Sequence, residues 1–205
     1  MAGDEELLSA WNAGDGRAGE RLFRRHFVSV ARFFRTKVDG DVEDLVQRTF
    51  LGCLEGRRRF RGEGSFRSYL FAIAYRVLYT HYRTARADDR LDLSAVSLHD
   101  LSPSPSAIVA QQREHQLLLA GLRRISVDYQ VVLELYFWEG MTAAELAAML
   151  SIPLGTALTR LRRARERLKA VLAELAPGAP PPRDGELEDW ARSLRDVVIG
   201  PRSAA

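Results

Sequence analysis

Residues 142–169 constrain the fold more than any other segment, because two helical patterns follow one another there with a defined break between them. Thr142 and Glu145 have the spacing of a capping box, which starts a helix by satisfying two backbone N–H groups. Ser151 and Pro153 then interrupt the pattern, and proline is well tolerated in the first turn of a following helix. The sequence therefore predicts a helix, a tight turn and a second helix.

The second helix of this pair has two unlike faces when its residues are placed about 100° apart. The apolar face is expected to pack against the domain and comprises Leu154, Ala157, Leu158, Leu161, Ala164 and Leu168. The other face carries hydroxyls and arginines, which a helix in the major groove uses for phosphates and base edges. The predicted contacts to duplex DNA are Thr156, Thr159, Arg160, Arg162, Arg163 and Arg167.

Charge is concentrated in this helix rather than spread over the chain. Residues 156–169 hold six Lys and Arg against one Glu, a net charge of +5, whereas the whole chain carries only +3. A local positive patch on a nearly neutral protein indicates a directed contact with a polyanion. The simpler alternative is a solvated surface helix that happens to be rich in arginine.

The remaining composition argues against metal, cofactor or catalytic chemistry. Cys53 is the only cysteine, and the four histidines show no spacing typical of metal ligands. No nucleophile, base and orienting group stand in an arrangement that predicts an enzyme. The acidic start of the chain lacks the pattern of a signal peptide, and no apolar run is long enough to cross a bilayer. We therefore expect a non-enzymatic cytoplasmic protein without a cofactor and not embedded in a membrane.

The chain is predicted to be all-α, with two small helical domains joined by a flexible linker. Helical patterns dominate residues 5–86 and resume over residues 113–175. The acidic stretch between them, residues 87–112, contains an SPSPS sequence and reads as the linker. A proline-rich tether begins the last segment, residues 176–205, where a short amphipathic helix is also expected.

A second nucleic-acid signal lies in the helix expected after residue 65. Its core stripe is predicted to be Phe66, Tyr69, Leu70, Ile73, Ala74 and Val77, and its opposite face to carry Phe71, Tyr75, Tyr79 and Tyr82 among Arg67, Arg76 and Arg83. Aromatic rings between arginines hold unpaired bases, since stacking contributes roughly 1–3 kcal/mol per base. The alternative is that these rings pack a second core against neighbouring helices.

The segment before this helix, residues 57–65, is a positive loop. It contains four arginines, and two glycines flank Glu63. Such a loop suits the phosphates of single-stranded DNA, and the pattern of a nucleotide-binding P-loop is absent.

Three motifs in one order resemble the extracytoplasmic-function group of bacterial RNA polymerase sigma factors, of the sigma-70 family. They are DVEDLVQRTFLGCLEG (residues 41–56), FRGEGSFRSYLFAIAYR (60–76) and the helix-turn-helix within residues 129–168. The resemblance covers most of residues 20–172 outside the linker. It implies a transcription initiation factor whose first domain (sigma region 2) docks on core RNA polymerase and opens the promoter −10 element. The second domain (sigma region 4) would read the duplex −35 element.

The resemblance also assigns residues. The polymerase-binding helix would use Asp41, Asp44, Gln47 and Phe50. The −10 element would be held by Arg61, Ser65, Phe66, Tyr69, Tyr75, Arg76, Tyr79, Tyr82 and Arg83. Members of the group are commonly held inactive by an anti-sigma factor, so such a partner is expected beside core RNA polymerase and promoter DNA.

The chain departs from the family pattern where bases would be read. The recognition helix, commonly G-T-V-K-S-R, is here residues 155–160 with the sequence GTALTR, and Ser151 replaces the usual turn glycine. These changes affect the promoter sequence rather than the scaffold. The alternative function is a stand-alone helix-turn-helix regulator, which would not account for the motifs in residues 41–76.

Overall fold

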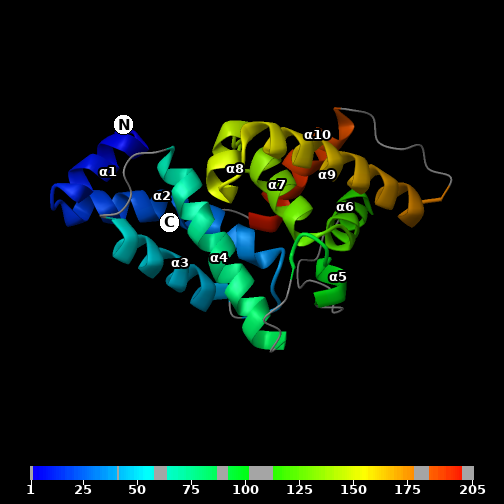
Figure 1. Ribbon diagram of the computed structural model, residues 1–205, viewed down its shortest axis with the longest axis horizontal. Coiled ribbons are helices and arrows are strands. Elements are labelled where there is room, and N and C mark those ends of the chain that lie inside the picture. Colours follow the sequence, from blue (N-terminus) through cyan, green and yellow to red (C-terminus); the bar gives the residue numbers. More distant parts are fainter. Residues whose placement is uncertain are drawn as a thin grey trace.

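The computed structural model describes residues 2–40, 42–57, 64–86, 92–101, 113–177 and 185–199. Within these ranges the chain is helical, and its only β feature is an isolated bridge between Ser97 and Ser126. The helices are α1 (Asp4–Asn12), α2 (Gly16–Arg35), α3 (Val42–Gly56), α4 (Phe66–Arg86), α5 (Leu98–Leu101), α6 (Arg113–Arg124), α7 (Val127–Phe137), α8 (Ala143–Leu150), α9 (Leu154–Leu175) and α10 (Glu186–Ile199) (Figure 1). The predicted all-α class is confirmed.

The first domain consists of α1–α4, each of which packs against a neighbour in this group. Asp15 starts α2, because its carboxylate accepts hydrogen bonds from the backbone N–H groups of Arg17 (2.9 Å) and Ala18 (3.3 Å). Trp11 lies so close to Gly19 that a Cβ there would come within 2.5 Å of the indole nitrogen. Glycine at position 19 therefore allows α1 and α2 to approach.

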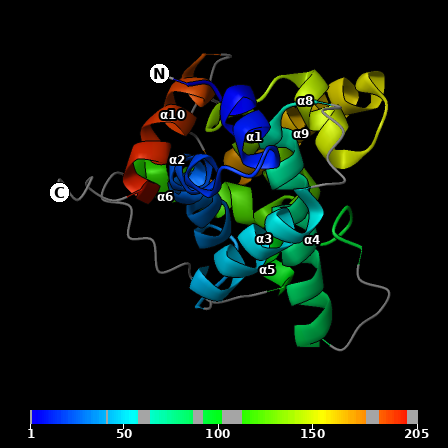
Figure 2. The ribbon, with the colours of Figure 1, turned by 90° about the vertical axis from the view of Figure 1, so that its left-hand side faces the viewer.

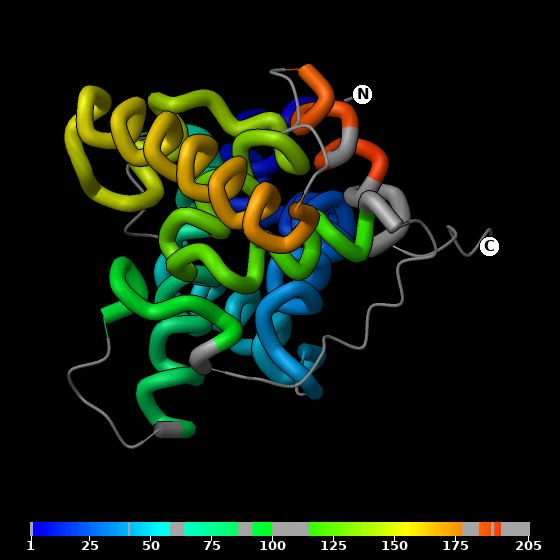
Figure 3. Tube along the Cα trace, turned by 90° about the vertical axis from the view of Figure 1, so that its right-hand side faces the viewer, coloured from blue at the N-terminus to red at the C-terminus, as the bar shows by residue number. Residues whose placement is uncertain are grey.

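The second domain is built around α7, against which α9, α8 and α6 pack. Eight of the eleven residues of α7 are buried, as expected of a helix surrounded by others. Both α8 and α6 also contact α9, which lies on the side facing the viewer in Figure 3.

The two domains pack against each other through α4 and α8 (Figure 1 and Figure 2). The C-terminal helix α10 contacts α6 and α7 of the second domain and α2 of the first. Leu187 and Ala191 of α10 are buried. The expected amphipathic helix is therefore present, and its buried residues pack beside Leu118 and Phe137 of the second domain. The side chains of Trp190 and Leu194, part of its expected apolar pattern, lie outside the described residues.

Part of the predicted linker is packed rather than loose. Leu93 and Leu98 are buried, and the backbone N–H groups of Val127 and Asp128 donate to the carbonyls of Val96 (3.0 Å) and Leu93 (3.2 Å). The expectation of a flexible linker is thus wrong for residues 92–101, because Leu93 and Leu98 pack into the hydrophobic core. Residues 87–91 and 102–112 lie outside the described residues.

Over the described ranges, none of the helices combines the length and the apolar character that a bilayer crossing requires.

Candidate nucleic-acid interface

The helix-turn-helix is formed by α8 and α9, and its local chemistry is as predicted. The Thr142 hydroxyl accepts from the Glu145 N–H (3.2 Å), and the Glu145 carboxylate accepts from the Thr142 N–H (2.8 Å). Ser151 ends α8 in the left-handed conformation with φ of 55°, and Pro153 is the N-cap residue of α9. A non-glycine residue in this conformation is uncommon, so the turn is held by its surroundings.

The two faces of α9 largely follow the prediction. The buried residues are Ala157, Leu161, Ala164, Leu168, Val171 and Leu172. Thr156, Thr159, Arg162, Arg163 and Arg167 are exposed, as a DNA-binding face requires. Leu154 and Leu158 contradict the prediction, because they are 49% and 52% exposed instead of packed. Leu158 instead lies at the edge of an open pocket that Tyr136 and Phe137 of α7 also line.

Arg160 differs from the other predicted arginines because it is held within the protein. Its guanidinium pairs with the carboxylate of buried Asp128 at 2.9 Å, and its side chain is only 24% exposed. Arg162 instead pairs with Glu166 at 2.7 Å on the open surface, where an ion pair contributes little to stability. The predicted DNA contact of Arg160 would therefore require that its guanidinium leave Asp128.

The predicted faces of α4 are partly wrong. Phe71 and Tyr82, expected on the open face, are buried, and the Tyr82 hydroxyl donates to the Lys37 carbonyl. Phe66 is buried too, as the core stripe required, so neither it nor Tyr82 is exposed for stacking on a base. The actual stripe runs through positions 66, 70, 74, 78 and 82, with Phe71 beside it.

The other predicted −10 residues are exposed to different degrees. Tyr69, Tyr75 and Tyr79 are half-buried, while Arg76 and Arg83 are exposed. Arg61, together with most of the arginine-rich loop, lies outside the described residues.

Asp128 connects the two predicted DNA-binding helices. One of its carboxylate oxygens accepts from the Tyr75 hydroxyl of α4, and the other pairs with Arg160 of α9. Burial and the negative charge of Asp128 both raise the pKa of Tyr75, so this phenol stays protonated as a donor. Tyr75, a predicted −10 contact, and Arg160, a predicted −35 contact, therefore bind the same carboxylate.

A second contact joins the start of α4 to the start of α8. Glu145 accepts from the Ser65 hydroxyl (2.8 Å) and the Arg67 guanidinium (3.0 Å), in addition to its capping bond to Thr142. Burial opposes ionisation of Glu145, but these three donors outweigh it and lower its pKa to about 2. Arg67 also donates to the Glu139 carbonyl at 2.7 Å.

Two buried ion pairs complete the contact between the domains. Lys37, which is fully buried after α2, pairs with Glu134 of α7. Arg32 of α2 pairs with Glu139 at 3.2 Å. We call these contacts, with those of Asp128 and Glu145, the interdomain seam. Our sequence analysis missed it, although acidic residues at 128 and 134 within the apolar stretch of α7 were a usable signal, since buried charges need partners.

The predicted polymerase-binding helix α3 forms an apolar groove of about 650 Å³ with α2. Gln47 is exposed at the groove, and Phe50 lines it. Phe27, Leu51 and Leu54 line it too, and each of these three side chains is about half exposed. Asp44 lies outside it, on the surface, where it pairs with Arg48 at 2.8 Å. Asp41 is not among the described residues. Phe27, Leu51 and Leu54 were not predicted as part of this site, although their spacing on the two helices was visible.

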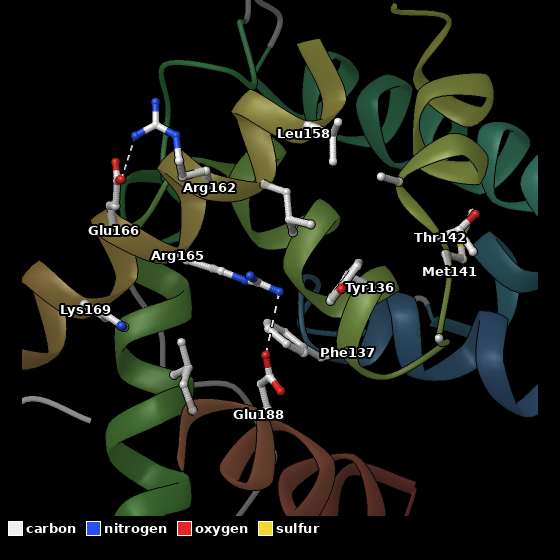
Figure 4. Close-up of a pocket in the computed structure, with 14 residues that line it drawn as sticks. Tyr136, Phe137, Met141, Thr142, Leu158, Arg162, Arg165, Glu166, Lys169 and Glu188 are labelled. Atoms are coloured by element: carbon white, nitrogen blue, oxygen red, sulfur yellow. Dashed lines mark hydrogen bonds and ion pairs between the residues drawn. The ribbon is translucent and has the colours of Figure 1, made fainter. Parts of the chain in front are cut away.

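A larger open pocket, of about 1020 Å³, lies between α7, α9 and α10 (Figure 4). Arg165 crosses it, with its guanidinium 5.1 Å from the ring centroids of Tyr136 and Phe137. Glu188 of α10 approaches the same guanidinium at 3.7 Å. Arg165 thus lies across the pocket, whereas Arg162, at its edge, is 64% exposed.

Comparison with known proteins identifies the family. Residues 21–87 match the family model of Sigma-70 region 2, and residues 115–168 match that of Sigma-70, region 4. The ECF RNA polymerase sigma factor SigM of Mycobacterium tuberculosis is 30% identical over 178 residues, which cover 85% of this chain and 87% of the relative. The ECF RNA polymerase sigma-E factor of Escherichia coli K12 is 27% identical, over 80% of this chain and 92% of the relative.

Solved structures agree with this comparison. CnrH, in complex with the cytosolic domain of CnrY, superposes with a TM-score of 0.62 at 25% identity, covering 84% of this chain and 99% of CnrH. RpoE of Bartonella quintana, in complex with the anti-sigma factor NepR, has the same fold, with a TM-score of 0.56 at 21% identity over 75% of this chain and 95% of RpoE. The chain belongs to the sigma-70 family, in the ECF group of RNA polymerase sigma factors. A stand-alone regulator is not favoured.

Proposed function

We propose that this sigma factor binds core RNA polymerase through the α2–α3 groove and directs it to promoters with α9 and α4. In this proposal α9 reads the duplex −35 element, and the surface of α4 holds the separated −10 strand. The two DNA-binding domains would span residues 5–86 and 113–175, with 87–112 between them and 176–205 after them.

The exposed face of α9 is the observation that carries the proposal. A capped helix-turn-helix presents Thr159, Arg162 and Arg163 to solvent, while the opposite face is fixed in the domain core. The N-terminal part of such a helix enters the major groove, and arginines there contact guanine edges or phosphates.

The polymerase contact rests on the groove between α2 and α3. Half-exposed Phe27, Leu51 and Leu54 leave a contiguous apolar surface, which is typical of a protein-binding site. Gln47 at its edge supplies a polar group. The acidic side chains at 41 and 44 would then contribute at the rim or stabilise the start of the helix.

The −10 contact requires the two domains to separate. Tyr75 is occupied by Asp128, and Ser65 is occupied by Glu145, so neither reaches a base in the closed arrangement. Tyr69, Tyr79, Arg76 and Arg83 complete the surface proposed for the single strand. The buried Phe66 and Tyr82 would support it from beneath.

An anti-sigma factor is the other partner that we propose. The structure of RpoE was determined with the anti-sigma factor NepR, and CnrH with the cytosolic domain of CnrY. The α2–α3 groove offers such a partner an apolar binding surface. A partner bound there would prevent the proposed contact with polymerase.

Run-off transcription on a pool of genomic promoter fragments tests the proposal. Purified core RNA polymerase is assayed with the protein, without it, and with a Phe27→Ala/Leu51→Ala variant. We expect discrete transcripts that need both components and that are lost with the groove variant. Tight promoter binding by the protein alone, without new transcripts, would instead support a stand-alone regulator.

A further inference from the structure

Leu154 and Leu158 form an apolar patch on the surface that the proposed function places in the major groove. They are 49% and 52% exposed and one helical turn apart, so their side chains adjoin. A Cβ added to Gly155 would meet no atom within 4 Å, which shows that protein does not cover this turn of α9. Burying these two side chains against another molecule would be favourable by about 25 cal/mol per Å² of apolar area removed from water.

The surroundings of the patch distinguish it from a protein-docking site. Its neighbours on α9 are exposed Thr156 and Thr159 and exposed Arg162, and on its other side Leu158 borders the open pocket that Arg165 crosses, so polar and basic groups flank the patch. The α2–α3 groove, by contrast, is lined mainly by apolar side chains. A short apolar patch within a polar, basic surface matches the edge of a base pair better than it matches an apolar protein helix.

Only one base presents an apolar group in the major groove. Thymine carries its C5 methyl there, whereas the edges of adenine, guanine and cytosine present nitrogen and oxygen donors or acceptors. Leucine can pair with none of those polar groups, and covering them would remove their hydration without replacing it. Resting on the proposed function, we propose that the Leu154–Leu158 patch reads a thymine methyl group in the −35 element.

This reading makes the departure of residues 155–160 from the family pattern a determinant of specificity. Leu158 stands where the family commonly has lysine, so a position suited to phosphates or acceptor groups is replaced by one suited to a methyl group. The patch would favour a T·A pair at one place and disfavour G·C there, in addition to the contacts of Arg162 and Arg163.

The test removes single methyl groups from the DNA. The −35 element is first defined by transcription from a promoter library with the holoenzyme, and each of its thymines is then replaced by deoxyuridine in promoter-binding assays. We expect the parent to lose about fourfold in affinity at one position, as one buried methyl predicts. Leu158→Ala should bind the thymine and deoxyuridine promoters equally. Val28→Ala, which changes an exposed apolar residue outside both proposed surfaces, should keep the parent's methyl sensitivity.

Each other outcome overturns the inference. A −35 element without thymine, a parent insensitive to every deoxyuridine, or a Leu158→Ala variant that keeps the sensitivity would exclude methyl readout. Loss of polymerase binding by Leu158→Ala, with no change in base preference, would make the patch a protein contact. Failure of the holoenzyme to select any promoter would instead overturn the proposed function, and this inference with it.

Discussion

The two helices expected to contact DNA differ in how they are presented. On α9 the polar face is open, and among its predicted contacts Arg160 is held by a residue of another helix, the Asp128 carboxylate of α7. On α4 the aromatic residues are buried or half-buried, and Tyr75 donates to Asp128 of the other domain. The closed chain therefore presents the helix proposed to bind the duplex and partly covers the helix proposed to bind the separated strand. The seam between the domains holds Tyr75, whereas Phe71 and Tyr82 are buried by contacts with Phe33 and with the Lys37 carbonyl inside the first domain.

The largest expected effect comes from breaking the buried pair of Lys37 and Glu134. Glu134→Ala leaves a buried ammonium without its carboxylate, so we expect the free energy of unfolding to fall by about 3–5 kcal/mol. Chemical denaturation measures it. Glu166→Ala, which removes the exposed partner of Arg162, should change the stability by less than about 0.5 kcal/mol. Equal effects of the two variants would contradict a closed seam.

The C-terminal helix provides the next test. Leu187 is buried against the second domain beside Phe137 and Leu168, and α10 also contacts α2. Leu187→Ala should therefore destabilise the closed chain by roughly 2–5 kcal/mol. The exposed neighbour Arg192 supplies the control, since Arg192→Ala keeps the apolar contact. Thermal unfolding that is unchanged in Leu187→Ala would show that α10 does not stabilise the second domain.

Arg163 tests the open helix. Arg163→Ala should weaken −35 binding by about 1–3 kcal/mol if the guanidinium contacts a guanine, and less, equally for all sequences, if it contacts phosphate. The free energy of unfolding of this variant should be unchanged, because the Arg163 side chain is exposed. Holoenzyme binding to a series of −35 variants measures both, with Arg192→Ala as the matched arginine control. An unchanged affinity across the series would remove Arg163 from the interface.

Tyr79 tests the covered helix. Tyr79→Ala should impair opening of the −10 element by about 1–3 kcal/mol, the contribution of one stacked base, and leave duplex binding nearly unchanged. Permanganate reactivity of unpaired thymines in the holoenzyme complex reports the opening. Thr80→Ala, at an exposed position next to it, is the control. Equal reactivity of the parent and Tyr79→Ala would exclude the stacking role.

The smallest effect concerns pH. Glu145 has an ordinary pKa of 4.5 and a pKa of about 2 in the folded chain. Because the folded value is the lower one, the stabilisation is fully present above pH 4.5 and is lost as the pH falls toward 2. Unfolding of the parent and of Glu145→Gln should therefore converge over this range. A constant difference between them down to pH 2 would contradict the contact with Ser65, Arg67 and Thr142.

How well the sequence predicted each region depends on whether local or distant contacts decide the structure there. The helix-turn-helix was predictable because a capping box, a left-handed residue and a proline act within a few residues. The buried stripe of α4 was not, since aromatic residues occur around most of that helix and its packing partners come from distant segments. Leu154 and Leu158 fit the apolar period of α9 but are about half exposed in the structure.

The seam shows the same limit. Its carboxylates were visible in the sequence, but their partners Lys37, Arg67 and Tyr75 are 97, 78 and 53 residues away along the chain from Glu134, Glu145 and Asp128. No local rule pairs groups at such separations. The groove of α2 and α3 was partly predictable. The family motif indicates Phe50, whereas Phe27 becomes part of the site only when the two helices pack.

The account is tested most directly by the distance between α4 and α8 in the free protein and in the holoenzyme bound to a promoter. Spin labels on Thr80→Cys and Ala144→Cys, both exposed, report it by pulsed electron paramagnetic resonance. Cys53 reacts poorly, because it is buried and burial raises the pKa of its thiol to about 12. The account predicts one short, narrow distribution in the free chain and a longer distance in the promoter complex. Identical distributions in the two states, or separated domains in the free chain, would contradict it.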